Sequence, residues 1–324
     1  MNLCDFASVA ARVRPAIRVA RLEKCNGLFQ GTNAMHTLLL SFLLLFLPTA
    51  LGGELRVVGS DLLGPEFATA LRDYARRNEV DLKLELERSR AGLSKLKSGQ
   101  AEIALLVLPT GESLPSAPWH SVTLAYHATV VLVAADLPLT QLRFSQLAGI
   151  FGSNSFANCT RWGELGLGGE WAGRTITPQA SASGARLSTE LFRHLVLHDG
   201  PLKSLVVQQD SMSALLRKMV VDQGGIALVS AVPADAKDLK TVPVAMGERD
   251  IAFGPTPQNL HAGDYPLCLP LWLVVRRDAI PASFAFLRLL LGDEVAATLE
   301  RVQLSPVPSM ARNQVSFELE QLLR

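Results

Sequence analysis

The strand-to-helix junction at Gly59-Ser60-Asp61 holds the residues of this chain best suited to bind a ligand. A short apolar strand, Leu55–Val58, precedes it, and an amphipathic helix follows from about Pro65. Backbone N–H groups in the first turn of a helix lack intrahelical partners, and the helix dipole favours negative charge there. With the Ser60 hydroxyl as a further donor, the junction predicts a site for a small anion.

The same residues also have a purely structural interpretation. Ser60 is a favoured helix-capping residue whatever the ligand. Asp61 complements the helix dipole, but its carboxylate would repel an anion if it pointed inward. The residues alone leave both interpretations open.

The segments that must position this junction alternate between strand-like and helix-like from residue 54 onward. The continuous apolar run Ile103–Leu108 is typical of a strand buried on both faces. Such alternation predicts an α/β protein with a mainly parallel or mixed sheet. Further strands are expected at Val80–Leu86, Ser121–Ala134, Thr175–Thr177, Ile226–Ser230 and Asp264–Val275, and helices at Pro65–Asn78, Gly92–Ser98, Leu142–Phe151, Ala185–Leu197, Met212–Val221, Ala282–Leu290 and Glu294–Val302.

The apolar block Leu38–Leu47 is too short to cross a membrane, which takes about 20 residues, and it suits a signal-peptide core. Cleavage is expected near Gly52, which predicts a periplasmic or secreted protein. Residues 1–34 show no pattern of a packed domain and are either an extended leader or sequence ahead of a true start at Met35; residues 35–52 form the signal peptide.

Charge and composition exclude some partners. Residues 53–324 carry two more acidic than basic side chains, and aromatic residues make up 6% of the chain. No basic patch alternates with aromatic residues, so nucleic-acid binding is not expected. Cys159 and Cys268 remain after cleavage; an exported compartment permits a disulfide, but two buried thiols are the preferred interpretation.

Five segments in order resemble the PstS-like periplasmic phosphate-binding proteins of ABC transporters, within the PBP-like domain family. The resemblance covers about residues 54–310. Its segments are Gly59-Ser60-Asp61-Leu62-Leu63, the run from Gly92 to Ala104, Phe144–Phe151 with Trp162, Ser181-Ala182-Ser183-Gly184-Ala185, and Tyr265-Pro266-Leu267 followed by Pro270-Leu271.

The resemblance implies a two-lobe clamshell, type II-like, with mixed sheets and two hinge crossovers. Lobe 1 would comprise residues 54–125 with 266–324, and lobe 2 residues 126–265. The ligand would lie in a cleft and be gripped by helix N-termini. A monomer without cofactor or metal, working with a transporter permease, is the expectation for this family.

The resemblance also assigns candidate ligand-binding residues, with departures from the family pattern. Leu62 and Ala185 stand where the family has threonine, and Val107 lies where it often has an acidic acceptor. Each hydrogen bond lost to a charged ligand costs about 1.5–3 kcal/mol. Arg90 or Arg186 would offset such losses by pairing with an anion. The candidate set is Ser60, Asp61, Leu62, Ser89, Arg90, Ser183, Gly184, Ala185 and Arg186.

Two functions remain open from the sequence. The leading one is an exported, non-catalytic binding protein for phosphate or another small oxyanion. The alternative is a degenerate module for protein interaction or sensing, without tight phosphate binding. Glu190, His194 and His198 share one predicted helix face, but lack a zinc-protease motif, so a metal site is not expected.

Overall fold

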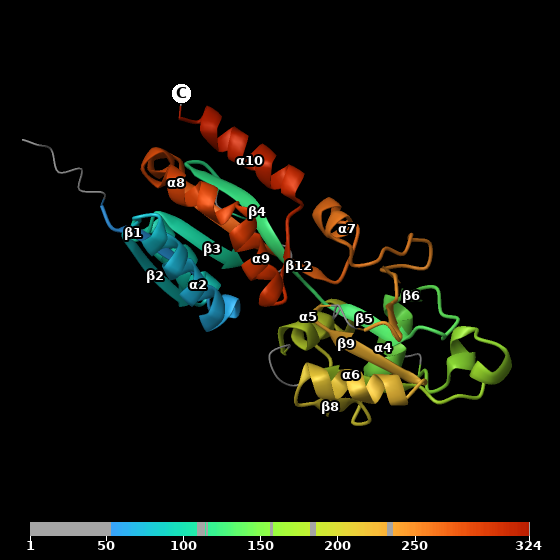
Figure 1. The fold of residues 1–324 in the computed structure, drawn as a ribbon. Coiled ribbons are helices and arrows are strands. Elements are labelled where there is room, and N and C mark those ends of the chain that lie inside the picture. The colour runs from blue at the N-terminus through green and yellow to red at the C-terminus, as the bar shows by residue number, and fades with distance from the viewer. Residues whose placement is uncertain are drawn as a thin grey trace, which may run out of the picture. The chain divides into compact units, whose positions relative to one another are not determined.

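The computed structural model describes residues 53–323 apart from 109–113, 115, 156–157, 182–185 and 232–235. The predicted leader and signal peptide lie outside the described residues. The described elements form an α/β protein with mixed sheets, as predicted (Figure 1).

One sheet has six strands in the order β13-β4-β12-β3-β1-β2. β1 is parallel to β2 and β3, whereas β12 is antiparallel to β3 and β4, and β13 is antiparallel to β4. The strands are β1 (Leu55–Ser60), β2 (Leu82–Glu87), β3 (Ile103–Val107), β4 (Trp119–Ala128), β12 (Cys268–Arg276) and β13 (Ser305–Pro306).

Helices cover both faces of this sheet. Figure 1 shows α2, α8 and α9 along one face, where Phe67, Phe286 and Leu299 share a buried apolar cluster. Leu96 of α3 belongs to a separate cluster with Val58 and Leu106 on the opposite face. The helices are α2 (Gly64–Arg77), α3 (Ser89–Lys97), α8 (Ile280–Leu290), α9 (Asp293–Arg301) and α10 (Ser309–Gln321).

A second sheet has five strands in the order β10-β5-β9-β7-β8. β7 is parallel to β8 and β9, and β5 is antiparallel to β9 and β10. Its elements are β5 (Val130–Ala134), β7 (Thr177–Ser181), β8 (Val207–Gln209), β9 (Gly225–Val229), β10 (Leu239–Thr241), α4 (Phe144–Phe151), α5 (Arg186–Leu197) and α6 (Met212–Val221).

Smaller elements connect these layers. A two-stranded parallel pair joins β6 (Leu142–Arg143) to β11 (Val244–Ala245), and α7 (Pro257–Ala262) precedes β12. The short 3-10 helices are η2 (Asp61–Leu63), η3 (Trp162–Leu165), η4 (Gly169–Trp171) and η5 (Arg277–Ala279).

The structure corrects two expected segments. The sequence predicts a short strand at Thr175–Thr177, but β7 runs from Thr177 to Ser181. Pro178 is tolerated because the β7–β8 pairing begins only at Gln179, so its missing N–H costs no bond to β8. A third C-terminal helix, α10, was missed because its apolar residues do not form one clean stripe: Met310 and Phe317 are exposed, while Arg312 is buried.

A buried hydrogen-bond network joins the β4–β5 junction to α5 and to the approach of β12. Thr129 donates from its N–H to the Leu267 carbonyl (2.8 Å) and from Oγ1 to the Ser188 carbonyl (2.9 Å). Its own carbonyl accepts the Tyr265 hydroxyl proton at 2.7 Å. His127 Nε2 lies 3.1 Å from Ser188 Oγ. Desolvation lowers the pKa of His127 to about 4, so its imidazole is uncharged at neutral pH.

Replacing Tyr265 with phenylalanine removes one bond of this network and leaves the buried Thr129 carbonyl without that donor. We expect Tyr265→Phe to lower the free energy of unfolding by about 1–3 kcal/mol, because an unsatisfied buried acceptor keeps its full desolvation cost. Urea unfolding of both proteins measures the difference. Equal midpoints with equal slopes would show that this bond contributes nothing.

The His127 network also makes stability depend on pH. The folded pKa of about 4 lies below the ordinary value of 6.5, so the unfolded state binds the extra proton between these values. The free energy of unfolding should therefore fall as the pH drops from 6.5 to 4, by roughly 3 kcal/mol in total from this residue. His127→Gln should flatten that part of the pH profile relative to the wild type, while the carboxylates titrate in both proteins. Parallel profiles would contradict this assignment.

Candidate functional site

A cavity of about 280 Å³ lies where parallel strands of both sheets end. Val107 is the last residue of β3, Leu62 and Leu63 directly follow β1, Ser230 directly follows β9, and Leu187 lies in the first turn of α5. Ligands of α/β proteins bind at the carboxyl ends of parallel strands, where the loops leave room and helices begin. This position makes the cavity the candidate ligand site.

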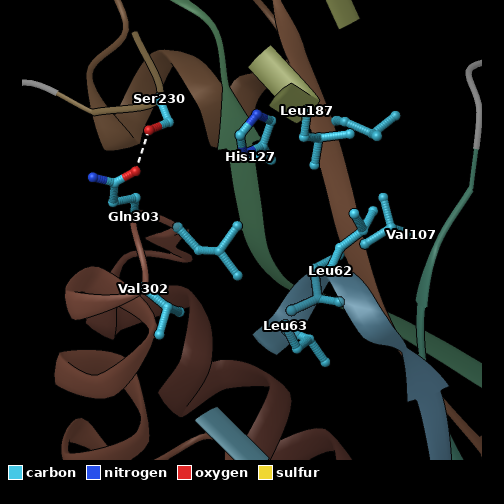
Figure 2. A pocket seen from close by; sticks show the side chains of 11 residues that line it. Leu62, Leu63, Val107, His127, Leu187, Ser230, Val302 and Gln303 are labelled. Atoms are coloured by element: carbon cyan, nitrogen blue, oxygen red, sulfur yellow. Dashed lines mark hydrogen bonds between the residues drawn. The ribbon is translucent and has the colours of Figure 1, made fainter. Parts of the chain in front are cut away.

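Most of the lining is aliphatic. Figure 2 shows Leu62, Val107 and Leu187 around the same space. Leu62 is 49% exposed, whereas Leu271 is fully buried. The aliphatic lining residues are Leu62, Leu63, Val107, Leu187, Leu269, Leu271, Val302 and Leu304.

Three uncharged polar side chains complete the described lining: His127, Ser230 and Gln303. Ser230 Oγ donates a hydrogen bond to Gln303 Oε1, drawn as a dashed line in Figure 2. The bond links the end of β9 to the segment between α9 and β13. His127 is 6% exposed and belongs to the buried network described above.

Gln303 has a backbone conformation that favours glycine. Its φ is +64°, and the turn that follows α9 is closed by Gln303 N–H to Glu300 O and Leu304 N–H to Leu299 O, both 2.9 Å. Helices commonly end this way with glycine or asparagine, because other side chains crowd the left-handed region. Glu79, His198 and Asp199 also have positive φ at helix ends and do not line this cavity, so the conformation belongs to the helix end. Here the Gln303 side chain reaches the cavity and Ser230.

The predicted residues of the first loop are divided between capping and the cavity. Ser60 is 1% exposed, and its Oγ accepts the N–H of Leu62 at 3.3 Å, which caps η2. Asp61 is exposed, and Leu62 lines the cavity. The observed contact of Ser60 is therefore that of a helix cap. The residue of this loop that reaches the cavity is the apolar Leu62.

Gly59 lies where two strands and a helix pack closely. A Cβ added at Gly59 would lie 2.4 Å from the carbonyl oxygen of Leu105 on β3. A Cβ at Gly92 of α3 would lie 3.3 Å from the Gly59 backbone nitrogen. These two glycines let β1, β3 and α3 approach closely.

Ser89 ties α3 to β3. It is 9% exposed, and its Oγ accepts the backbone N–H of Val107 at 3.0 Å. Arg90 follows it as an exposed residue in the first turn of α3. Neither side chain is among those that line the cavity.

The predicted second anion loop falls largely outside the described residues. Ser183, Gly184 and Ala185 are not described, and of Arg186 only its place at the start of α5 is. The two residues that follow have defined contacts: Leu187 lines the cavity and Ser188 bonds to His127. The start of α5 therefore lies at the cavity.

The sequence reasoning missed all three polar lining residues. His127 is a polar residue inside a β-rich run, and Ser230 ends a predicted strand. These positions in the sequence give little indication that either side chain lines a cavity. Nothing in the sequence around Gln303 marks its left-handed conformation.

Other candidate chemistry has structural explanations in the described ranges. Glu190 pairs with Arg193 at 3.0 Å, and His194 lies 3.2 Å from Asp199. The described part of the chain holds no cluster of three or more residues suited to bind a metal ion, and none of its helices has the length and apolar character needed to cross a bilayer. Cys159 and Cys268 are free thiols, and burial raises the pKa of Cys268 to about 11.

Comparison with known proteins confirms the predicted fold class and resemblance. The phosphate-binding protein PstS of Pseudomonas aeruginosa is 23% identical over 289 residues, which are 84% of this chain and 88% of the relative. Among solved structures, a possible phosphate binding protein from Planctomyces limnophilus matches with a TM-score of 0.63 at 17% identity, over 84% of this chain and 99% of its own. An ABC-type phosphate transport receptor from Vibrio cholerae matches with a TM-score of 0.55 at 20% identity, over 78% and 99%.

At these identities the structural likeness establishes the fold alone. The family model described as a PBP superfamily domain matches residues 48–294, from the end of the apolar block to the start of α9. Because this match spans well over half of the sequence, the chain belongs to the PBP superfamily domain family.

Proposed function

We propose that this protein is an exported, non-catalytic solute-binding protein that captures one small solute in the cavity between the strand ends. The observation that carries the proposal is the convergence of β1, β3, β9 and α5 on one cavity at their ligand-facing ends. In this proposal residues 54–125 with 266–324 and residues 126–265 are the two lobes, and the cavity is the cleft between them. We propose an ABC transporter permease as the partner, because one similar structure is that of an ABC-type phosphate transport receptor from Vibrio cholerae.

The relatives' names make phosphate the first ligand to consider. The described lining supports only a weak grip on such an anion. No residue with a charged side chain lines the described cavity, and Leu62 and Val107 bring aliphatic groups to it. Two or three missing hydrogen bonds to a charged ligand weaken binding by about 10³-fold or more.

The backbone donors are also in use. The N–H of Leu62 is taken by Ser60 Oγ, and the N–H of Val107 by Ser89 Oγ. A buried anion needs several such donors to replace its hydration. With respect to phosphate, these contacts favour the second candidate function. In that function the protein is a PBP-like module for sensing or protein interaction that does not bind phosphate tightly.

Blocking the cavity tests the proposed function. Val302 lines the cavity and is partly buried against the apolar cluster that contains Leu299, so Val302→Trp adds bulk at the cavity wall. We expect the wild type to bind one solute per chain in calorimetric titrations against inorganic oxyanions, small carboxylates and small neutral solutes. Val302→Trp should lose that binding, whereas the same change at Val221, which is 80% exposed and outside the lining, should keep it.

Two results would contradict the proposal. One is the absence of saturable binding for every compound of such a panel. The other is binding that Val302→Trp leaves intact.

The weakness of phosphate binding has its own test at position 62. Leu62→Thr places a hydroxyl donor at the cavity wall, while Leu62→Val has nearly the same shape without it. We expect Leu62→Thr to raise the affinity for inorganic phosphate about tenfold or more, as one hydrogen bond to a charged ligand provides, and Leu62→Val to leave it unchanged. Equal phosphate affinities in all three proteins, measured by calorimetry, would show that position 62 does not face the anion.

A further inference from the structure

Ser230 and Gln303 form a polar pair on one side of the cavity, next to the aliphatic Val302. Figure 2 shows Ser230 and Gln303 together on one side and Val107 and Leu187 on the other, with His127 between them. A lining of this kind fits a molecule with an aliphatic body and one polar end. The volume of about 280 Å³ corresponds to roughly nine water molecules at about 30 Å³ each, which is more than one tetrahedral oxyanion fills.

The polar side offers both a donor and an acceptor, without charge. Gln303 Oε1 accepts the Ser230 hydroxyl proton, so the Gln303 amide N–H groups and the Ser230 oxygen lone pairs remain for a ligand. A carboxamide presents the complementary pair, a carbonyl oxygen and an NH₂ group. An ionised carboxylate can only accept hydrogen bonds, whereas phosphate at pH 7 keeps at least one P–OH donor. Both are anions, and their charge would enter a cavity whose described lining holds no cation.

Gln303 brings its side chain to the cavity from the end of α9. Its φ of +64° suits glycine, yet the residue is a glutamine whose side chain lines the cavity.

We infer that the ligand of this cavity is an uncharged organic solute with a short aliphatic body and a single primary carboxamide-like head group, which Gln303 and Ser230 recognise. The inference rests on the proposed function and names its ligand class. The aliphatic body lies against Leu62, Val107 and Leu187, and the head group replaces water at Gln303 and Ser230.

The test uses three probes at pH 7: isovaleramide, isovalerate and inorganic phosphate. The first two share one aliphatic body and differ only in the charge and donors of the head group. Calorimetry of the full-length mature protein should show isovaleramide binding at least about tenfold more tightly than isovalerate or phosphate. Val302→Trp should abolish isovaleramide binding.

Gln303→Gly separates recognition from folding. Glycine adopts φ near +64° without strain, so the variant should keep or raise the melting temperature. It should nevertheless bind isovaleramide about tenfold more weakly, because the head group loses its donor. Ser230→Ala serves as the second variant and should weaken isovaleramide binding in the same direction.

The outcomes distinguish the inference from the proposed function. Binding of phosphate or isovalerate as tight as that of isovaleramide, or full isovaleramide affinity in Gln303→Gly, overturns the inference and leaves solute binding intact. A third result is that none of the three probes binds, while charged compounds of the wider panel bind and lose that binding in Val302→Trp. The inferred ligand class is then wrong, and the proposed solute-binding function stands. If no compound at all binds in that manner, both fail.

Discussion

Thr129 connects the segment before β12 and the start of α5 to the β4–β5 junction. Its backbone N–H, its hydroxyl and its carbonyl all form hydrogen bonds. Its N–H bonds to Leu267 before β12, its hydroxyl to Ser188 in α5, and its carbonyl to Tyr265. The residue is fully buried, so each of these bonds replaces hydration that folding removed. The start of α5 is thereby held next to His127, and Leu187 is placed in the cavity wall. The hydrogen bonds of Thr129 therefore fix the position of one wall of the candidate ligand site.

The second constraint is the absence of charge from the described lining. Ser60 and Ser89 lie outside the described lining, and each hydroxyl oxygen accepts a neighbouring backbone N–H group. The described cavity wall next to β1 and β3 consists of leucine and valine side chains. The uncharged imidazole of His127 and the Ser230–Gln303 pair provide the remaining polarity. This combination favours a neutral ligand on electrostatic grounds.

The α/β class and most elements were predictable from the sequence, because buried parallel strands are continuous apolar runs and surface helices have one apolar face. Ile103–Val107 and Phe67, Leu71 and Tyr74 of α2 show both patterns. The predicted strand Thr175–Thr177 was misplaced relative to β7, because the proline and the serine-rich segment that follow it are not typical of a strand. The predicted division into lobes stays a prediction, as do the roles of Ser183, Gly184, Ala185 and Arg186.

The candidate site was only half predictable. Leu62 and Val107 both stand out from the sequence as departures from the family pattern, and both line the cavity. His127, Ser230 and Gln303 come from segments far apart in the chain, and only the three-dimensional structure brings them together. A left-handed glutamine leaves no trace in local sequence pattern, because the conformation is set by the helix end and by the partner that the side chain reaches.

A crystal structure of the protein purified from its own cells, without added ligand, tests the central claim most directly. We expect a small organic molecule in the cavity, with its polar end hydrogen-bonded to Gln303 and Ser230. Its aliphatic body should lie against Leu62, Val107 and Leu187. A tetrahedral oxyanion bound by Ser60, Ser89 and the loop before α5 would contradict it.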